Sequence, residues 1–257
     1  MFMTERQNII YQLIKENGAV TVAELVKKFS VSDETVRRDL KQLEDDKLLQ
    51  RVHGGAISIV RTKTVANYTQ RLDENSPLKY ELSEYAITLI NDGDIIAIDA
   101  GTTALEFAEV LAKSGKKVTV ITHSLAVFEK LKDISGITGI LIGGYFSTDE
   151  NAFIGPLAIN MIKKLHVNKV FIFPSGISLG FGVSDFHFDL ALVQQELLGI
   201  AENVIVCADS SKFESAAVIS LCELSPAHTY VTDSKLPDNI YKLYTENNLK
   251  IVKGQDR

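Results

Sequence analysis

Residues 31–56 read VSDETVRRDLKQLEDDKLLQRVHGGA, a short amphipathic segment followed by a hairpin-like ending. Ser32 is a residue type that caps helix N-termini. The apolar residues behind it recur at helical spacing and are Val36, Leu40 and Leu43. We therefore predict a helix from Ser32 to about Asp46 that is buried along this apolar stripe.

Two further amphipathic segments precede this helix. Residues 4–18 place apolar side chains on one helical face, and residues 21–29 repeat the pattern. Thr21 and Glu24 have the spacing of a capping box at the start of the second segment. Three short helices of this kind form a helix-turn-helix, whose second helix enters the major groove with its N-terminal end first.

The exposed side of the third helix is polar. An arginine fork there can bind guanine with two hydrogen bonds or clamp a phosphate. An ordinary solvated helix, with its arginines paired to Glu34 or Asp39, is the alternative. The DNA-contacting candidates on this helix are Ser32, Thr35, Arg37, Arg38 and Lys41.

Residues 48–58 favour the DNA interpretation. The segment LLQRVHGGAIS predicts a strand, a turn at Gly54–Gly55 and a second strand. A hairpin that follows a helix-turn-helix is a wing, and Arg51, His53 and Gly54 would touch the phosphate backbone or the minor groove. Such contacts position a protein on DNA without reading its sequence. We predict a winged helix over residues 1–58 that binds a double-stranded DNA operator.

The charge is distributed unevenly between the two parts of the chain. Residues 1–57 carry nine Lys/Arg and nine Asp/Glu, whereas residues 58–257 carry 18 and 24 and hold the whole net charge of −6. Positive charge is local because only one face has to meet DNA. The acidic remainder repels a polyanion, so tight binding should require the right sequence and two copies of the chain.

The composition limits the classes of protein to which this chain can belong. A chain of 257 residues with 46% hydrophobic residues favours two domains with sizeable cores. No apolar run is long enough for a membrane span, and the N-terminus lacks the layout of a secretion signal. Cys207 and Cys222 stand in apolar surroundings and are expected to be reduced. We expect a cytoplasmic protein with no membrane contact.

Residues 59–79 are polar and weakly periodic, and we expect a linker there, followed by a second domain over residues 80–257. In the second domain, helix-like segments alternate with apolar strand-like segments. This alternation predicts an α/β domain with a mainly parallel sheet covered by helices on both faces. Ligands of such sheets lie beyond the carboxyl ends of the strands.

Several strand-like segments end in polar or glycine residues. A helix that begins near Thr103 would offer free N–H groups to a phosphate, although a plain capped turn is the alternative. The chain has neither the Walker nor the Rossmann glycine motif, which argues against a nucleotide enzyme. The ligand-binding candidates are Asp99, Gly101, Thr102, Thr103, Thr122, His123, Ser124, Gly143, Gly144, Asp209 and Lys212.

The front segment closely resembles the DNA-binding signature of DeoR-family bacterial transcriptional regulators. The matching positions are Val31, Ser32, Thr35, Arg37, Arg38, Asp39, Leu40, Leu43, Glu44, Leu48, Arg51 and residues 53–56. The stretches DAGTT (99–103), ITHS (121–124), LIGG (141–144), FIGP (153–156) and ADSSKF (208–213) resemble the sensor domain of the same family.

The resemblance implies a sensor fold similar to ribose-5-phosphate isomerase and glucosamine-6-phosphate deaminase. It also implies a repressor of a sugar-utilisation operon that a phosphorylated sugar releases from DNA. We expect a homo-oligomer, dimer or tetramer, that needs no cofactor and has no catalytic residue or metal.

Four positions depart from the family pattern. His123 stands where family members usually have Asn, and Pro174–Ser175 replaces a pair of small residues. Gln194 replaces the usual lysine, which removes a positive charge from the expected ligand site. Lys212 remains the clearest candidate cation.

Two other functions compete with the regulator. A sugar-phosphate isomerase or deaminase with a DNA-binding appendage would need a general base, for which the candidates are Asp99, Asp185, His187 and Asp209. A purely structural interaction protein would not explain the wing and the polar strand ends together. The segment DFHFD would place Asp185, His187 and Asp189 on one face of a strand, where they could bind a metal; a polar loop at the sugar pocket is the favoured interpretation.

Overall fold

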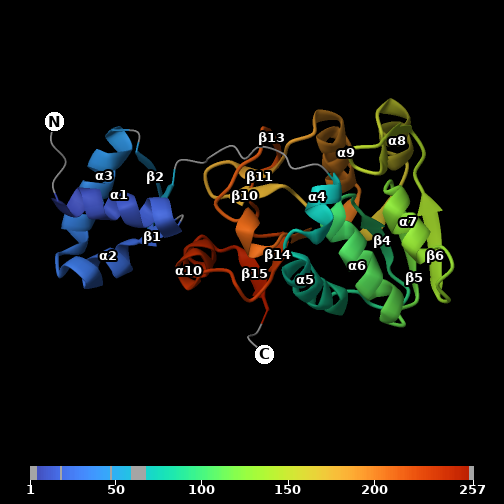
Figure 1. Ribbon diagram of the computed structural model, residues 1–257, viewed down its shortest axis with the longest axis horizontal. Helices are drawn as coiled ribbons and strands as arrows, with labels where there is room; N and C mark the ends of the chain where they lie inside the picture. The colour runs from blue at the N-terminus through green and yellow to red at the C-terminus, as the bar shows by residue number, and fades with distance from the viewer. Residues whose placement is uncertain (1–4, 18, 47, 59–67, 255–257) are drawn as a thin grey trace.

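The computed structural model describes residues 5–17, 19–46, 48–58 and 68–254. A small N-terminal unit of three helices and three strands precedes a larger α/β unit (Figure 1). The small unit contains α1 (Glu5–Asn17), α2 (Val22–Phe29) and α3 (Asp33–Asp45), and its sheet has the order β1-β3-β2. This arrangement confirms the predicted winged helix.

Local signals set the helices of the N-terminal unit. The capping box at Thr21 and Glu24 is present, since each side chain bonds the other residue's backbone N–H. Ser32 caps α3 by accepting from the N–H of Thr35. The buried residues of α3 include the predicted stripe, Val36, Leu40 and Leu43.

The hairpin differs from the prediction by one residue. Strands β2 (Leu49–Val52) and β3 (Gly55–Ser58) are joined by His53 and Gly54, so Gly55 belongs to β3 instead of the turn. Gly55 is required there because a Cβ atom would lie 2.1 Å from the carbonyl oxygen of Val20. That carbonyl belongs to β1 (Ala19–Thr21), an unpredicted strand that pairs with β3.

The large unit is built on a seven-stranded sheet of order β15-β14-β12-β9-β4-β5-β6, in which every neighbouring pair is parallel. This sheet confirms the predicted α/β class. Its strands are β4 (Ile95–Ile98), β5 (Val118–Thr122), β6 (Ile137–Leu141), β9 (Val167–Ile172), β12 (Ala201–Cys207), β14 (Thr229–Thr232) and β15 (Lys250–Lys253).

Helices cover both faces of this sheet. One buried cluster joins the sheet to α5 (Ser76–Thr88), α6 (Thr102–Lys113) and α7 (Leu125–Leu131). A second cluster, on the opposite face, involves α8 (Pro156–Ile162), α9 (Phe188–Gly199) and α10 (Asp238–Glu246). Each cluster combines apolar residues of the strands with apolar residues of the helices on that face, as expected for a sheet buried on both sides.

Two small antiparallel sheets extend the large unit and were not predicted. One pairs β7 (Tyr145–Ser147) with β8 (Ala152–Ile154). The other contains β10 (Gly176–Ser178), β11 (Gly182–Asp185) and β13 (Ile219–Cys222). Their strands have three or four residues, which is too short for a clear alternation in the sequence.

The expected linker over residues 59–79 lies partly outside the described residues, which resume at Tyr68. From there the chain forms α4 (Tyr68–Asp73), and α5 begins at Ser76. The two units are in contact, because β1 lies against α10 (Figure 1). Ala19 and Ile57 of the small unit belong to the same buried cluster as Leu243 of α10.

Candidate functional site

The candidate DNA-contacting residues of α3 share one exposed face. The Arg37, Arg38 and Lys41 side chains are exposed, and the hydroxyls of Ser32 and Thr35 lie 2.8 Å apart at the N-terminal end of the helix. The Arg37 guanidinium is paired with the carboxylate of Asp33 one turn earlier. The Asp33 side chain and the Arg37 side chain are both about half exposed, so water screens this pair and DNA can compete for the arginine.

The wing lies beside this helix. A shallow hollow between α3 and the hairpin is lined by Arg37, Glu44, Arg51, Val52, His53 and Gly54. Glu44 holds the hairpin in place by accepting from the backbone N–H of Arg51 at 2.8 Å. Residues that were expected to contact DNA from the helix and from the wing are therefore brought together on one surface.

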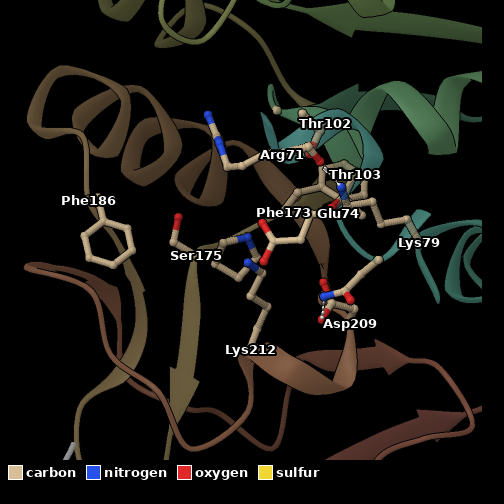
Figure 2. Close-up of a pocket in the computed structure, with 13 residues that line it drawn as sticks. Arg71, Glu74, Lys79, Thr102, Thr103, Phe173, Ser175, Phe186, Asp209 and Lys212 are labelled. Atoms are coloured by element: carbon tan, nitrogen blue, oxygen red, sulfur yellow. Dashed lines mark hydrogen bonds between the residues drawn. The ribbon is translucent and has the colours of Figure 1, made fainter. Parts of the chain in front are cut away.

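A second candidate site is a pocket at the carboxyl ends of the central strands (Figure 2). Of the eleven ligand-binding candidates, the five that line it are Gly101, Thr102, Thr103, Asp209 and Lys212. The other residues of its wall are Arg71, Glu74, Asn75, Lys79, Phe173, Pro174, Ser175 and Phe186. The pocket is thus assembled from α4, α5, the start of α6 and the segments after β9, β11 and β12.

The start of α6 has the features of an anion site. Gly101 precedes the helix with φ of 109°, a backbone conformation that side chains disfavour, and no side chain caps the first turn. Thr102 is 7% exposed, and its hydroxyl oxygen accepts from the Nζ of Lys79 at 3.1 Å. Free N–H groups at a helix N-terminus attract negative charge.

Three cationic side chains come to this pocket from separate elements: Arg71 from α4, Lys79 from α5 and Lys212 from the 3-10 turn η1 (Ser210–Lys212). Lys79 is 4% exposed, and burial lowers the pKa of its ammonium group below the ordinary value. Arg71 and Lys79 were not predicted, because they lie in the polar stretch whose weak periodicity indicated a linker.

Asp209 contributes an acceptor to the same pocket. Its side chain is 1% exposed. One carboxylate oxygen, Oδ1, accepts from the N–H of Ser211 at 3.0 Å and from the amide of Asn75 at 3.4 Å. The other oxygen, Oδ2, is buried and has no hydrogen bond within the described part of the chain. A buried acceptor without a partner calls for a donor from a ligand or water.

Asp99 lies behind the pocket instead of lining it. Its carboxylate is fully buried and accepts from the amide of Gln194 at 2.8 Å and from the N–H of Phe173 at 3.1 Å, and Nε2 of His123 lies 3.1 Å away. The same Gln194 amide donates to Asp185 at 3.2 Å. Burial, and next the charge of Asp99, raise the pKa of the Asp185 carboxyl.

The remaining candidates serve the scaffold around the pocket and do not line it. Ser124 caps α7 by accepting from the N–H of Val127, and the Thr122 hydroxyl accepts from the N–H of Ser124. Gly144 lies against β8, where a Cβ atom would come within 2.6 Å of the Ile154 carbonyl oxygen. His123 is bound to Asp99, and Gly143 is exposed away from the pocket.

The segment DFHFD does not form one strand. Asp185 ends β11, His187 precedes α9, and Asp189 is exposed in the first turn of that helix. The His187 ring is paired with Glu150 at 2.9 Å, and this contact raises the pKa of the imidazole. No group of three or more His, Cys, Asp or Glu side chains with a metal-binding arrangement occurs among the described residues.

Two general expectations can be compared with the structure. No helix in the described ranges is long and apolar enough to cross a membrane. Cys207 is a buried free cysteine, and Cys222 is a half-buried one.

Family models match both units. A model described as the DeoR-like helix-turn-helix domain matches residues 6–62, and one described as the DeoR C terminal sensor domain matches residues 74–234. Together the two models cover most of the chain.

Several proteins that are similar to this chain are named as regulators of transcription or of operons. The L-fucose operon activator of Haemophilus influenzae is 32% identical over 97% of this chain and all of that protein. The lactose phosphotransferase system repressor of Lactococcus lactis is 31% identical over 88% of this chain and 89% of that protein. The transcriptional repressor GlcR of Bacillus subtilis is 31% identical over 94% and 92%.

Solved structures match parts of this chain. Ribose 5-phosphate isomerase A from Neisseria gonorrhoeae gives a TM-score of 0.42 at 20% identity, over 58% of this chain and 56% of that chain. The beta subunit of eIF2B from Chaetomium thermophilum gives 0.44 at 19% identity, over 71% and 59%. The family assignment rests on the family models and the full-length relatives: this chain belongs to the DeoR family and is a DNA-binding transcriptional regulator, not an enzyme.

Proposed function

We propose that this regulator controls a sugar-utilisation operon as a repressor and that a phosphorylated sugar, bound in the pocket at the start of α6, releases it from its operator. In this proposal α3 and the wing contact DNA through Ser32, Thr35, Arg37, Arg38, Lys41, Arg51, His53 and Gly54. The names of the relatives support a sugar-linked operon, since they include a lactose system repressor and an L-fucose operon activator.

The observation that carries the effector proposal is the convergence of positive charge in an otherwise acidic domain. Arg71, Lys79 and Lys212 reach one pocket with the uncapped start of α6, although residues 58–257 have a net negative charge. Glu74 and Asp209 also line the pocket, so three positive side chains face two negative ones, and the N–H groups at the start of α6 add positive potential. A phosphate dianion would balance this excess of positive charge and accept hydrogen bonds from the N–H groups of the helix.

The sugar would lie on the Asp209 side of the phosphate. The free Oδ2 atom of Asp209 can accept from a sugar hydroxyl, and it is within the same pocket. Asp99 is assigned a supporting role, because Gln194, Phe173 and His123 already occupy its oxygens. The pocket therefore matches an anion with neighbouring hydroxyl groups.

Two further features complete the proposal. A single winged helix contacts one half-site, so operator binding requires a homo-oligomer whose copies read a repeated or palindromic site. The protein acts in the cytoplasm, where it meets both operator DNA and phosphorylated sugars. The ligand controls DNA affinity by binding unequally to two dimer arrangements, with a coupling of about 1–3 kcal/mol.

The test combines ligand screening with DNA binding. Sugars and their phosphates are screened for an increase in Tm, and operator affinity is measured on duplexes selected from a random pool. The double variant Thr102→Ala, Lys212→Ala should keep wild-type DNA affinity and lose the response to the phosphate that stabilises the wild type. Lys113→Ala, an exposed lysine at the end of α6, is the control. A double variant that still responds would remove this pocket from the mechanism.

A further inference from the structure

Large apolar side chains are exposed together on one side of the sensor domain. Tyr145 is 65% exposed, Leu157 62% and Phe188 66%. The α8–α9 face, as we call it, consists of Tyr145 on β7, Leu157 and Met161 on α8, and Phe188 and Leu192 on α9. A gathering of this kind marks an interaction surface, whereas single exposed apolar residues do not.

The elements of this face are in contact with one another. Helix α8 packs against α9, and β8, the partner strand of β7, contacts both helices. Tyr145 lies against Gly155, the residue just before α8, where a Cβ atom would meet its ring at 2.7 Å. On each helix the two apolar residues are four positions apart and so project from the same side. Figure 1 shows α8 and α9 side by side at one edge of the molecule.

The charges on the two helices are of opposite sign. Lys163 and Lys164 follow α8, which contains no acidic residue. Asp189 and Glu196 lie on α9, which contains no basic residue. Within one chain Lys163 already pairs with Glu196 at 3.3 Å, whereas Lys164 and Asp189 are exposed. A two-fold axis that sets α8 of one copy against α9 of another therefore pairs Lys164 with Asp189 twice and covers the apolar residues of both copies. The surface is complementary to itself, as an isologous interface requires.

We infer that the α8–α9 face is the dimer interface of this regulator, with two helices from each copy packed as a four-helix layer. The inference rests on the proposed function in one respect, since reading an operator with winged helices requires two copies. It goes beyond that proposal because it names the surface, the partner and the way in which the helices pair.

The effector pocket is continuous with this interface. Phe186 lines the pocket, and Phe188, two residues later, is the most exposed aromatic residue of the face. Between them, His187 is bound to Glu150, and the same Glu150 oxygen accepts from Arg71 at 2.6 Å. An anion that draws Arg71 into the pocket weakens its bond to Glu150 and so alters the contact that holds residues 186–188. This connection lets ligand change the dimer arrangement.

The experiment measures association of the full-length chain by analytical ultracentrifugation across a range of concentrations. Leu157→Glu and Phe188→Glu should each raise the dimer dissociation constant by tenfold or more, because a charge would enter the apolar centre of the interface. Both residues are exposed in the single chain, so circular dichroism should show an unchanged fold. Tyr80→Glu is the control, since Tyr80 is 41% exposed and lies on α5, which covers the opposite face of the large sheet.

A charge-reversal pair tests how the helices pair. Lys164→Glu and Asp189→Lys should each weaken the dimer, and the double variant should recover most of the lost affinity. A monomeric wild type would overturn the inference and would leave the face to another protein. A dimer that persists in both Leu157→Glu and Phe188→Glu would also overturn the inference. If the double variant Lys164→Glu, Asp189→Lys did not recover dimer affinity, the pairing of α8 with α9 would be wrong.

The Tm shift caused by inorganic phosphate separates this inference from the proposed function. A monomeric Leu157→Glu variant that is still stabilised by phosphate supports both the interface and the anion pocket. If phosphate stabilises neither the wild type nor the variant while the dimer results hold, the effector proposal fails and the interface stands.

Discussion

The side-chain amide of Asn239 donates a 2.8 Å hydrogen bond to the backbone carbonyl of Ala19, 220 positions earlier in the chain. This bond joins α10 of the sensor domain to β1 of the winged helix. Asn247, just after α10, donates in the same way to the carbonyl of His53 in the wing turn. The DNA-binding unit is therefore held by the sensor domain through α10.

The same helix is linked to the effector pocket. The carboxylate of Asp233 accepts from the N–H of Ser210, the first residue of the turn that carries Lys212. Asp233 also accepts from the N–H of Lys235 at 2.9 Å, and α10 begins three residues later. A short chain of contacts therefore connects the Lys212 turn to the helix that holds the wing.

Asn239→Ala should loosen the contact between the two units. The carbonyl of Ala19 would lose its side-chain donor, and we expect the free energy of unfolding to fall by about 0.5–1.5 kcal/mol. Urea denaturation of the full chain measures this change. Asn8→Ala, the same substitution at an exposed position of α1, should have little effect. Equal losses in the two variants would show that the Asn239 bond contributes nothing specific.

Arg38→Ala should weaken operator binding by about 1–3 kcal/mol if the arginine reads a base. If it contacts a phosphate, the dependence of affinity on salt should become shallower instead. Arg37→Ala should act in the same direction but less strongly, because DNA binding must compete with the Asp33 pair. Affinity is measured by fluorescence anisotropy across salt concentrations, with Lys113→Ala as control. Wild-type affinity in both arginine variants would refute the assignment of α3 as recognition helix.

Lys79→Gln should separate binding from stability. Glutamine keeps a donor for Thr102 but removes the buried charge, so affinity for the sugar phosphate should fall about tenfold, or about 1.4 kcal/mol.

The same variant should also change how the free energy of unfolding depends on pH. The folded pKa of Lys79 is below its usual value of 10.5, so the wild type gains stability as the pH rises towards 10.5. Lys79→Gln should lack this gain in stability, which urea denaturation at several pH values measures. If the variant and the wild type gave the same dependence of stability on pH, this would argue against a buried cation at Lys79.

Gln194→Lys should change the pH dependence of stability. The raised pKa of Asp185 contributes stability below the unfolded value of 3.8, and this contribution is lost as the pH rises through the folded pKa. A lysine ammonium beside Asp185 would favour the charged form of its carboxylate and should remove that loss. Unfolding free energies from pH 3.8 upwards test this expectation. Gln195→Lys, its exposed neighbour, should leave the wild-type profile unchanged.

Glu214→Gln should stabilise the protein at neutral and alkaline pH. Burial raises the pKa of the Glu214 carboxyl to about 7, even though its Oε1 atom accepts from the Tyr244 hydroxyl at 2.5 Å. The wild type therefore loses stability as the pH rises from 4.5 through 7, by up to about 3 kcal/mol, and the variant should not. Unfolding at pH 5 and pH 8 compares the two. The exposed Glu223→Gln serves as control; a wild type equally stable at both pH values would contradict the expectation.

The sequence by itself determined the winged helix and the alternation of strands and helices in the sensor domain. Capping at Ser32, the apolar stripe of α3 and the apolar runs of the parallel strands act over a few residues, so they can be read from spacing. Gly101, Thr102 and Lys212 were likewise found at strand ends, because the carboxyl ends of parallel strands meet at one edge of the sheet.

Only the tertiary structure decided which of the expected residues form the pocket. The order of strands places Asp99 against Gln194, 95 positions away, and this contact withdraws its carboxylate from the cavity. Arg71 and Lys79 enter the pocket because α4 and α5 lie beside α6, and their polar stretch carries no local pattern that indicates this. Contacts between distant segments depend on how the sheet and its helices pack, which residue spacing does not encode.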